Sequence, residues 1–110
     1  MDKMDHIQEL LREFIKERNW EKYHTPKNLS MAITIEAAEL MEHFNWCDFS
    51  KEELEKDKLK EISYEMADIL HFLLRLADIL NIDLYKASLE KIELNKKRFP
   101  ISEAKNIKRC

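Results

Sequence analysis

Glycine is absent from this 110-residue sequence, and proline occurs only twice. β-Sheets need tight turns, and the favoured two-residue hairpins rely heavily on glycine. The lack of glycine therefore argues against a β-sandwich or a β-barrel. It equally argues against a phosphate-cradling P-loop and a glycine-rich dinucleotide-binding motif, because both are built on glycines at fixed positions.

The sequence also has few cysteines, no long hydrophobic run and no strong excess of one charge. Cys47 and Cys110 cannot by themselves form a disulfide framework or a zinc site, and they are typical of free thiols in a reducing compartment. The first twenty residues are charged throughout, unlike a signal peptide, and no stretch approaches the ~18 apolar residues of a membrane span. With a net charge of −3, we expect a cytoplasmic protein with neither a membrane nor a nucleic-acid polymer as partner.

What the sequence does contain is a fine mixture of charged (37%) and hydrophobic (45%) residues, the composition of amphipathic helices. Apolar side chains recur at helical spacing, and Thr25, Ser50 and Asp83 are typical helix N-caps. The expected helices cover about Met4 to Trp20, Pro26 to Asn45 or Trp46, a region that begins at Ser50 and is strongest from Leu59 to Leu80, and about Leu84 to Arg98.

This pattern predicts a single all-α domain over residues 1–110 with a four-helix bundle-like fold. Pro100 stops the last helix, and the polar tail from Ser102 to Cys110 is expected to fray. A core of this size is marginal on its own. We therefore expect helices of separate subunits to associate into a homo-oligomer.

Two otherwise apolar helical segments each carry a pair of carboxylates. Glu36 and Glu39 interrupt the first segment, and Glu65 and Asp68 interrupt the second. Each pair has i, i+3 spacing, which places both side chains on one face of a helix with about 5–6 Å between their Cβ atoms. If the two helices pack antiparallel, all four carboxylates come together.

Four ionised carboxylates in one place are unfavourable without a cation. Removing one from water costs several kcal/mol, and like charges raise one another's pKa. Arg75 is the only lysine or arginine between Lys60 and Lys86, and one guanidinium cannot neutralise four acids. Mg²⁺ or Mn²⁺ can, because both prefer oxygen ligands and Mg²⁺ is commonly shared with substrate phosphates. The pattern favours metal-dependent chemistry on phosphates; the alternative, two solvated helix faces, stays open.

Four segments stand in a defined order around these acids. They are Glu17 to Leu29, the motif Glu36-x-x-Glu39 followed after 25 residues by Glu65-x-x-Asp68, the pair Asn45-Trp46, and Asn95 to Pro100. This set resembles the all-α nucleoside triphosphate pyrophosphohydrolases, the MazG-like superfamily, and within it the dCTP pyrophosphatase branch. The resemblance extends over roughly Leu11 to Pro100.

The resemblance implies hydrolysis of a (deoxy)nucleoside triphosphate, dCTP or a modified dCTP among them, to the monophosphate and pyrophosphate. It implies Mg²⁺, replaceable by Mn²⁺, held by Glu36, Glu39, Glu65 and Asp68. It also implies a homodimer or homotetramer with shared active sites. Glu36 and Glu39 are the candidate catalytic residues, and Glu39 is the candidate for orienting the attacking water.

Candidate substrate-binding residues come from the same segments. By resemblance, Trp20 and Trp46 help form the base pocket, where each stacking contact is worth about 1–3 kcal/mol, and Asn95 lies at the nucleotide. Phe72 stands where the branch tends to have tyrosine, which leaves the base preference open. The remaining candidates are His24, Lys27, Asn28 and Arg98, with His24, Lys27 and Arg98 as possible phosphate partners.

Two other functions fit parts of the pattern. A di-iron carboxylate four-helix protein uses paired Glu-x-x-His motifs on facing helices. Asp68-x-x-His71 is one imperfect half of that pattern, whereas Glu39 and His43 have the wrong spacing. A non-enzymatic helical interaction module instead predicts that Glu36 and Glu39 are exposed and that no nucleotide binds.

Overall fold

The computed structural model describes residues 2–45 and 55–104, and the regular elements in these ranges are all helices. They are, in chain order, α1 (Lys3–Glu17), the short 3₁₀-helix η1 (Glu21–Tyr23), α2 (Pro26–Glu42), α3 (Lys56–Leu80), α4 (Leu84–Arg98) and α5 (Ile101–Ala104). The prediction of an all-α protein is confirmed. The predicted helix start at Ser50 and the candidate base-pocket residue Trp46 lie outside the described residues.

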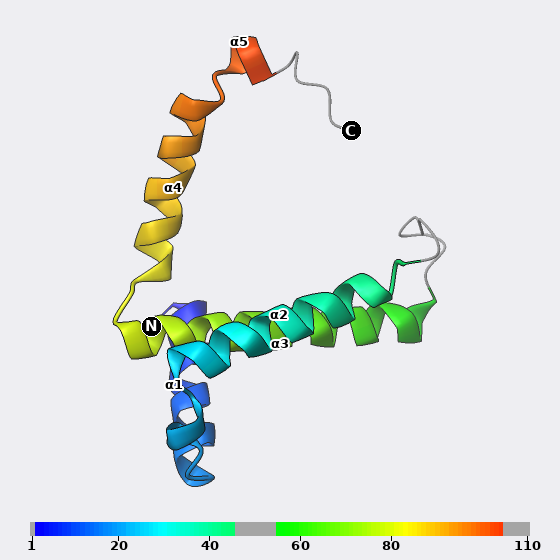
Figure 1. Cartoon of the computed structure of the whole chain (residues 1–110), viewed down its shortest axis with the longest axis vertical. Coiled ribbons are helices and arrows are strands. Elements are labelled where there is room, and N and C mark those ends of the chain that lie inside the picture. The colour runs from blue at the N-terminus through cyan, green and yellow to red at the C-terminus, as the bar shows by residue number, and fades with distance from the viewer. Residues whose placement is uncertain (1, 46–54, 105–110) are drawn as a thin grey trace.

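Three of the helices pack together. α2 and α3 run antiparallel and side by side, and α1 crosses them and packs on α3 (Figure 1). Their shared core contains Ile15 of α1, Leu29 of α2, and Ile62, Leu74 and Ala77 of α3, all buried. Burying a leucine or isoleucine side chain contributes about 1.5–3 kcal/mol. These contacts hold α2 and α3 in one register, and that register positions the functional side chains.

Short polar side chains begin the helices at the predicted places. Thr25 Oγ1 accepts a hydrogen bond from the Asn28 N–H at 3.1 Å, and Asp83 Oδ1 accepts one from the Lys86 N–H at 3.1 Å. Pro26 occupies the first turn of α2, where its missing N–H leaves no hydrogen bond unmade. The predicted caps at Thr25 and Asp83 are therefore confirmed, and α4 has the predicted bounds.

Asparagine takes the role of glycine at two helix ends. Asn19 and Asn81 both have a φ of 56°, a left-handed conformation that asparagine adopts more readily than most residues. After Asn19, the Trp20 N–H donates to the Ile15 carbonyl at 3.1 Å. This turn ends α1 at Glu17, three residues short of the predicted Trp20.

The fourth long helix does not complete a bundle within one chain. α4 projects away from the other three helices (Figure 1). Its apolar side chains are consequently exposed, with Tyr85 71%, Leu89 49%, Ile92 51% and Leu94 58% accessible. The bundle-like arrangement predicted for the chain is thus limited to α1, α2 and α3, because no other part of the described chain covers the apolar face of α4.

Beyond α4 the chain turns at Pro100 and forms the single turn of α5. Residues 102–104 therefore belong to a helix rather than to a frayed tail, whereas residues 105–110 lie outside the described part of the chain. Among the helices that the structure describes, none is both long and apolar enough to cross a lipid bilayer.

Candidate functional site

The two acidic motifs meet where α2 lies against α3. Glu36 of α2 and Glu65 and Asp68 of α3 each place a carboxylate oxygen within 4.8 Å of the other two. The i, i+3 spacing puts each pair on one helix face, and the antiparallel packing turns those faces toward each other. We call these three residues the acidic cluster.

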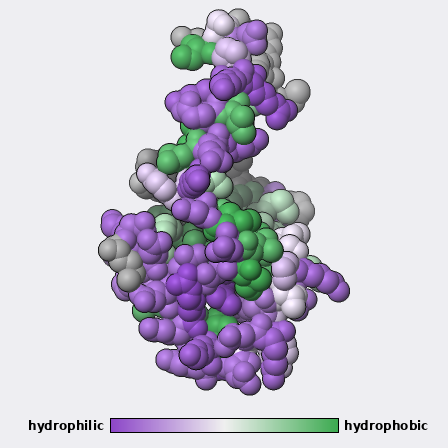
Figure 2. All heavy atoms as spheres, turned by 90° about the vertical axis from the view of Figure 1, so that its left-hand side faces the viewer, coloured by the Kyte–Doolittle hydropathy of each residue, from purple (hydrophilic) through white to green (hydrophobic). Residues whose placement is uncertain are grey.

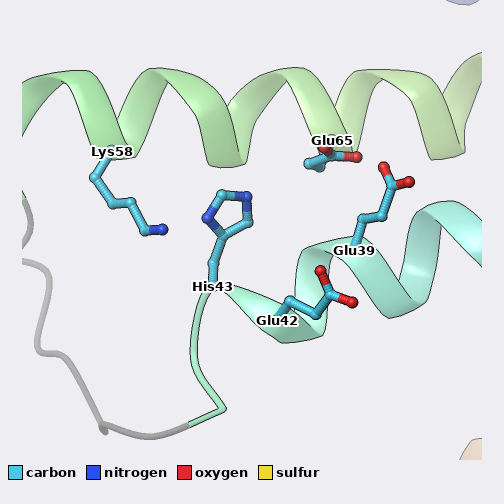
Figure 3. A pocket seen from close by; sticks show the side chains of 5 residues that line it. All are labelled: Glu39, Glu42, His43, Lys58 and Glu65. Carbon is cyan, nitrogen blue, oxygen red and sulfur yellow. The ribbon is translucent and has the colours of Figure 1, made fainter.

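Glu39, the fourth predicted acid, lies beside the acidic cluster. Its carboxylate is close enough to Glu36 to raise the pKa of that residue. It is half-buried, and it shares a cleft with Glu65 (Figure 3). The structure therefore brings the four predicted acids together, three of them in a tight group and Glu39 at its edge.

The neighbouring acids of the cluster change the pKa of Glu36. Its pKa is raised to about 7, first by the hydrogen bond that a protonated Glu36 makes with Glu65, then by burial, and then by Glu39 and Asp68. Oε2 of Glu36 and Oε2 of Glu65 are both shielded from solvent and have no hydrogen-bond partner among the described residues. Within residues 2–45 and 55–104, no basic side chain forms an ion pair with the cluster.

The cluster fits a hard divalent cation. Its donors are all carboxylate oxygens from two helices, and two of those oxygens are buried without partners. Such a set is suited to Mg²⁺ or Mn²⁺. No histidine joins the cluster among the residues that the structure describes, so the di-iron pattern is not reproduced. Glu36 and Glu39 are half-buried, not exposed as an interaction module requires.

An open cleft adjoins the cluster toward the C-terminal end of α2. It has a volume of about 430 Å³ and is lined by Glu39, Glu42, His43, Lys58 and Glu65. Figure 3 shows the first three reaching from the end of α2, and Lys58 and Glu65 reaching from α3, toward the same space. The cleft thus combines acids at one end with two basic groups at the other.

Sequence reasoning missed the roles that position gives to His43 and Lys58. His43 was weighed only as an iron ligand, and Lys58 was not considered. The signal lies in the register of α2 on α3, in which Glu36 faces Glu65. His43 lies seven residues after Glu36, and Lys58 lies seven residues before Glu65. Seven residues are close to two helical turns, so His43 and Lys58 also face each other.

A second polar group joins α1, α3 and the turn before α2. Arg75 of α3 is only 8% exposed, and its Nη1–H donates to Asp78 Oδ2 at 3.2 Å. Arg12 of α1 donates to both oxygens of Asp78 at 2.7 Å. Arg75 Nε–H also donates to His24 Nδ1 at 3.3 Å. We call these four residues the arginine network.

The arginine network fixes the state of His24, one of the predicted substrate-binding residues. Burial and then the positive charge of Arg75 lower the pKa of His24, and a ring nitrogen that accepts a hydrogen bond carries no proton. His24 is therefore neutral, with its proton on Nε2. In this chain Arg75 is directed to His24 and Asp78, away from the acidic cluster.

Three other predicted residues lie around the turn that leads into α2. Trp20 is 43% exposed and stacks edge-on against Phe14, with ring centroids 5.8 Å apart. Asn28 uses its side-chain amide to donate to the Tyr23 carbonyl at 3.0 Å, which closes the turn. Lys27 is exposed at the start of α2, at the opposite end of that helix from His43.

The last predicted residues are divided between α3 and α4. Phe72 is half-buried on α3, one turn beyond Asp68. Asn95 and Arg98 are exposed near the end of α4, and the Arg98 guanidinium lies over the Phe99 ring at 5.1 Å. Because α4 projects from the packed helices (Figure 1), one chain does not bring Asn95 and Arg98 to its own acidic cluster.

Known proteins are similar to this chain in sequence and in the arrangement of their helices. dCTP pyrophosphatase 1 of Rattus norvegicus is 34% identical over 101 residues, which cover 89% of this chain and 59% of the relative. The human protein of that name is 34% identical over 112 residues, covering 96% of this chain and 64% of the relative. The chain thus spans about three fifths of the length of these curated relatives.

A solved structure extends the likeness to the fold. A pyrophosphatase from Archaeoglobus fulgidus is 42% identical to this chain and superposes with a TM-score of 0.82, covering 91% of this chain and 94% of the other. Residues 31–109, which include both acidic motifs, match the MazG-like family. The chain therefore belongs to the MazG-like family.

Proposed function

We propose that this protein hydrolyses a nucleoside triphosphate to the monophosphate and pyrophosphate. The observation that carries this proposal is the acidic cluster, in which Glu36 and Glu65 are half-buried, Asp68 is exposed, and one oxygen of Glu36 and one of Glu65 are buried without a partner among the described residues. It is supported by relatives named dCTP pyrophosphatase 1 and by the similar structure named a pyrophosphatase. From these names we also propose a substrate class of dCTP or modified dCTP.

In this proposal Mg²⁺, for which Mn²⁺ can substitute, is held by Glu36, Glu65 and Asp68, with Glu39 at the edge of the site. When bound, the cation neutralises phosphate charge and polarises a phosphate oxygen. A triphosphate carries about four negative charges, which the protein's own net charge of −3 would otherwise repel. The acids thus select a substrate that arrives with a divalent cation.

The protein's own contribution to the reaction is positioning. Glu39 stands beside the cluster and faces the open cleft, where its carboxylate orients a water molecule and accepts its proton. Glu36 and the two α3 acids would hold the cation to which the phosphates bind, and so would fix the phosphate-bearing end of the substrate. Phosphoryl-type transfer depends mainly on such positioning and on charge stabilisation, so a rigid pair of packed helices suits the reaction.

The proposal includes association of two or four copies of this chain. α4, which projects from the packed helices (Figure 1), exposes apolar side chains. A groove of about 1150 Å³ lies between the start of α1, the end of α3 and the start of α4, and Figure 2 shows hydrophobic surface where α4 leaves the packed helices. A second copy would cover this surface, and its α4 would supply Asn95 and Arg98 to a shared site.

A pair of isosteric substitutions tests the proposed reaction. Glu36→Gln and Asp68→Asn each remove one negative charge from the acidic cluster while keeping its shape. We expect both to abolish Mg²⁺-dependent release of pyrophosphate from a panel of nucleoside triphosphates, with helical content unchanged by circular dichroism. Glu61→Gln, an exposed glutamate on the same helix as Asp68, is the matched control. Full activity in both cluster variants would remove these residues from the mechanism.

A further inference from the structure

The cleft beside the acidic cluster ends in two basic side chains that come from different helices. His43 is the residue at which α2 ends, and Lys58 lies in the first turn of α3. Both are half-buried, and Figure 3 shows them next to each other, with His43 between Lys58 and Glu65. The antiparallel register creates this pair, because residues far apart in sequence face each other across the cleft.

Neither basic group has a polar partner in the part of the chain that the structure describes. Within residues 2–45 and 55–104, the side chains of His43 and Lys58 form neither a hydrogen bond nor an ion pair, although Glu39, Glu42 and Glu65 line the same cleft. His43 Nδ1 is also shielded from solvent and has no partner there. Buried polar nitrogens normally have a hydrogen-bond partner, so the His43 ring has hydrogen-bonding capacity that the described residues do not meet, beside a lysine that is equally unpaired.

The position of the pair defines the kind of anion. About one helical turn separates Glu39 from His43, so a ligand of a few atoms reaches from the acids to the bases. Its near end has to carry a cation to be accepted by the acidic cluster, and its far end has to be negative. A pyrophosphate group with its divalent cation has both properties.

The phosphate partners proposed from sequence do not lie at this cleft in the same chain. Lys27 is at the other end of α2, sixteen residues from His43, which is roughly 24 Å along a helix. Arg98 ends α4, which projects away from α2 and α3 (Figure 1). His43 and Lys58 are the basic residues that line the cleft beside the cluster.

We propose that His43 and Lys58 form a binding subsite for the pyrophosphate part of the substrate and for the pyrophosphate product. This subsite rests on the proposed function, since it assumes a triphosphate held by the acidic cluster. Lys58 contributes a positive charge, and His43 contributes a ring N–H, which is a donor even in neutral imidazole. Both residues bind the ligand, and neither takes part in bond cleavage.

Steady-state kinetics of Lys58→Met and His43→Gln test the subsite. A hydrogen bond to a charged group is worth enough to expect a roughly tenfold higher KM for the triphosphate and a roughly tenfold weaker inhibition by pyrophosphate. Inhibition by the nucleoside monophosphate should stay unchanged, which a general structural defect would not produce. Lys58→Arg should retain most of the affinity, and Lys60→Met, which removes an exposed lysine from the same helix, should behave as wild type.

Direct binding separates this subsite from the proposed reaction. Calorimetric titration of the full chain with pyrophosphate and Mg²⁺ needs no turnover, so it is informative even if every nucleotide proves not to be hydrolysed. Weaker pyrophosphate binding by Lys58→Met or His43→Gln, with Lys60→Met unaffected, supports the subsite. Equal pyrophosphate affinity in wild type and in both variants, each with native helical content, overturns it.

Discussion

α3 carries two polar groups that handle charge in opposite ways. Near its middle, Glu65 and Asp68 meet Glu36 of α2, so acidic side chains face one another, and one oxygen each of Glu36 and Glu65 has no partner among the described residues. Two turns later, Arg75 and Asp78 belong to the arginine network, in which opposite charges are joined by hydrogen bonds of 2.7 to 3.3 Å. The two groups share a helix but not a purpose.

The difference separates a structural polar group from a functional one. Bidentate arginine–carboxylate contacts are among the stronger polar interactions, and here they tie α1, α3 and the turn before α2 together. The acidic cluster forms no such contact among the described residues, and it raises the pKa of Glu36 to about 7. Retaining such repulsion in a small domain makes sense only if a ligand relieves it.

The largest expected effect comes from removing one charge of the acidic cluster. Glu65→Gln should reduce activity at least about a hundredfold, because a candidate metal ligand is lost. The same change should raise the melting temperature of the metal-free protein, because repulsion of Glu36 is relieved. Steady-state assays and thermal melts in a chelator measure both. If Glu65→Gln kept full activity and had a lower melting temperature, the acidic cluster would be a structural group like the arginine network, and the distinction drawn above would be wrong.

An intermediate effect is expected in the arginine network. Arg75→Met keeps the apolar stem but breaks the bonds to Asp78 and His24, and we expect a loss of about 1–3 kcal/mol in the free energy of unfolding. Arg12→Met removes a 52% exposed partner of the same aspartate and should cost about 1 kcal/mol or less. Denaturant titration measures the free energy of unfolding of both variants. Equal losses in the two would mean that the burial of Arg75 does not affect stability.

The smallest effect is a pH dependence that the two groups do not share. Because the pKa of Glu36 is raised to about 7, the metal-free folded protein binds a proton more tightly than the unfolded chain does. Its free energy of unfolding should therefore fall as pH rises from about 4.5 toward about 7. Bound cations need the ionised acid, so stabilisation by Mg²⁺ should grow over the same range and level off above it.

Thermal melts with and without Mg²⁺ between pH 5.5 and 8.5 measure this dependence. Glu36→Gln is the control, since its amide has no proton to exchange in that range. If Mg²⁺ raised the melting temperature of the wild-type protein by the same amount at every pH in this range, Glu36 would not titrate there. Asp78 of the arginine network should contribute no change in this window, because its pKa is lowered, chiefly by its hydrogen bonds from Arg12. His24, whose pKa is lowered by burial and by Arg75, should instead raise the free energy of unfolding as the pH rises, opposite in sign to Glu36 and equal with and without Mg²⁺.

Much of this could be predicted from sequence because it depends on local order. Helical spacing and the caps at Thr25 and Asp83 determine where α2 and α4 begin. The meeting of Glu36 with Glu65 and Asp68 follows from i, i+3 spacing once the two helices pack antiparallel. These features need only the geometry of single helices and one pairing.

The rest depends on contacts between distant segments. The pairing of His43 with Lys58 requires the register of α2 on α3, which the buried core side chains set. Arg75 looked from sequence like a partial neutraliser of the acids, whereas its neighbours Asp78 and His24 take its hydrogen bonds. The direction of α4 could not be predicted either. Its apolar residues indicate that one face of the helix is buried, but they do not indicate which surface covers that face.

The isolated course of α4 has a consequence for folding. A lone helix of about 12–15 residues is only marginally stable in water, and α4 has 15 residues with its apolar side chains uncovered. If copies of the chain associate as proposed, contact with another copy would keep this segment ordered, and folding of α4 and self-association would then be a single equilibrium. Dilution should accordingly diminish the far-ultraviolet signal of the protein even where nothing else in the solution changes.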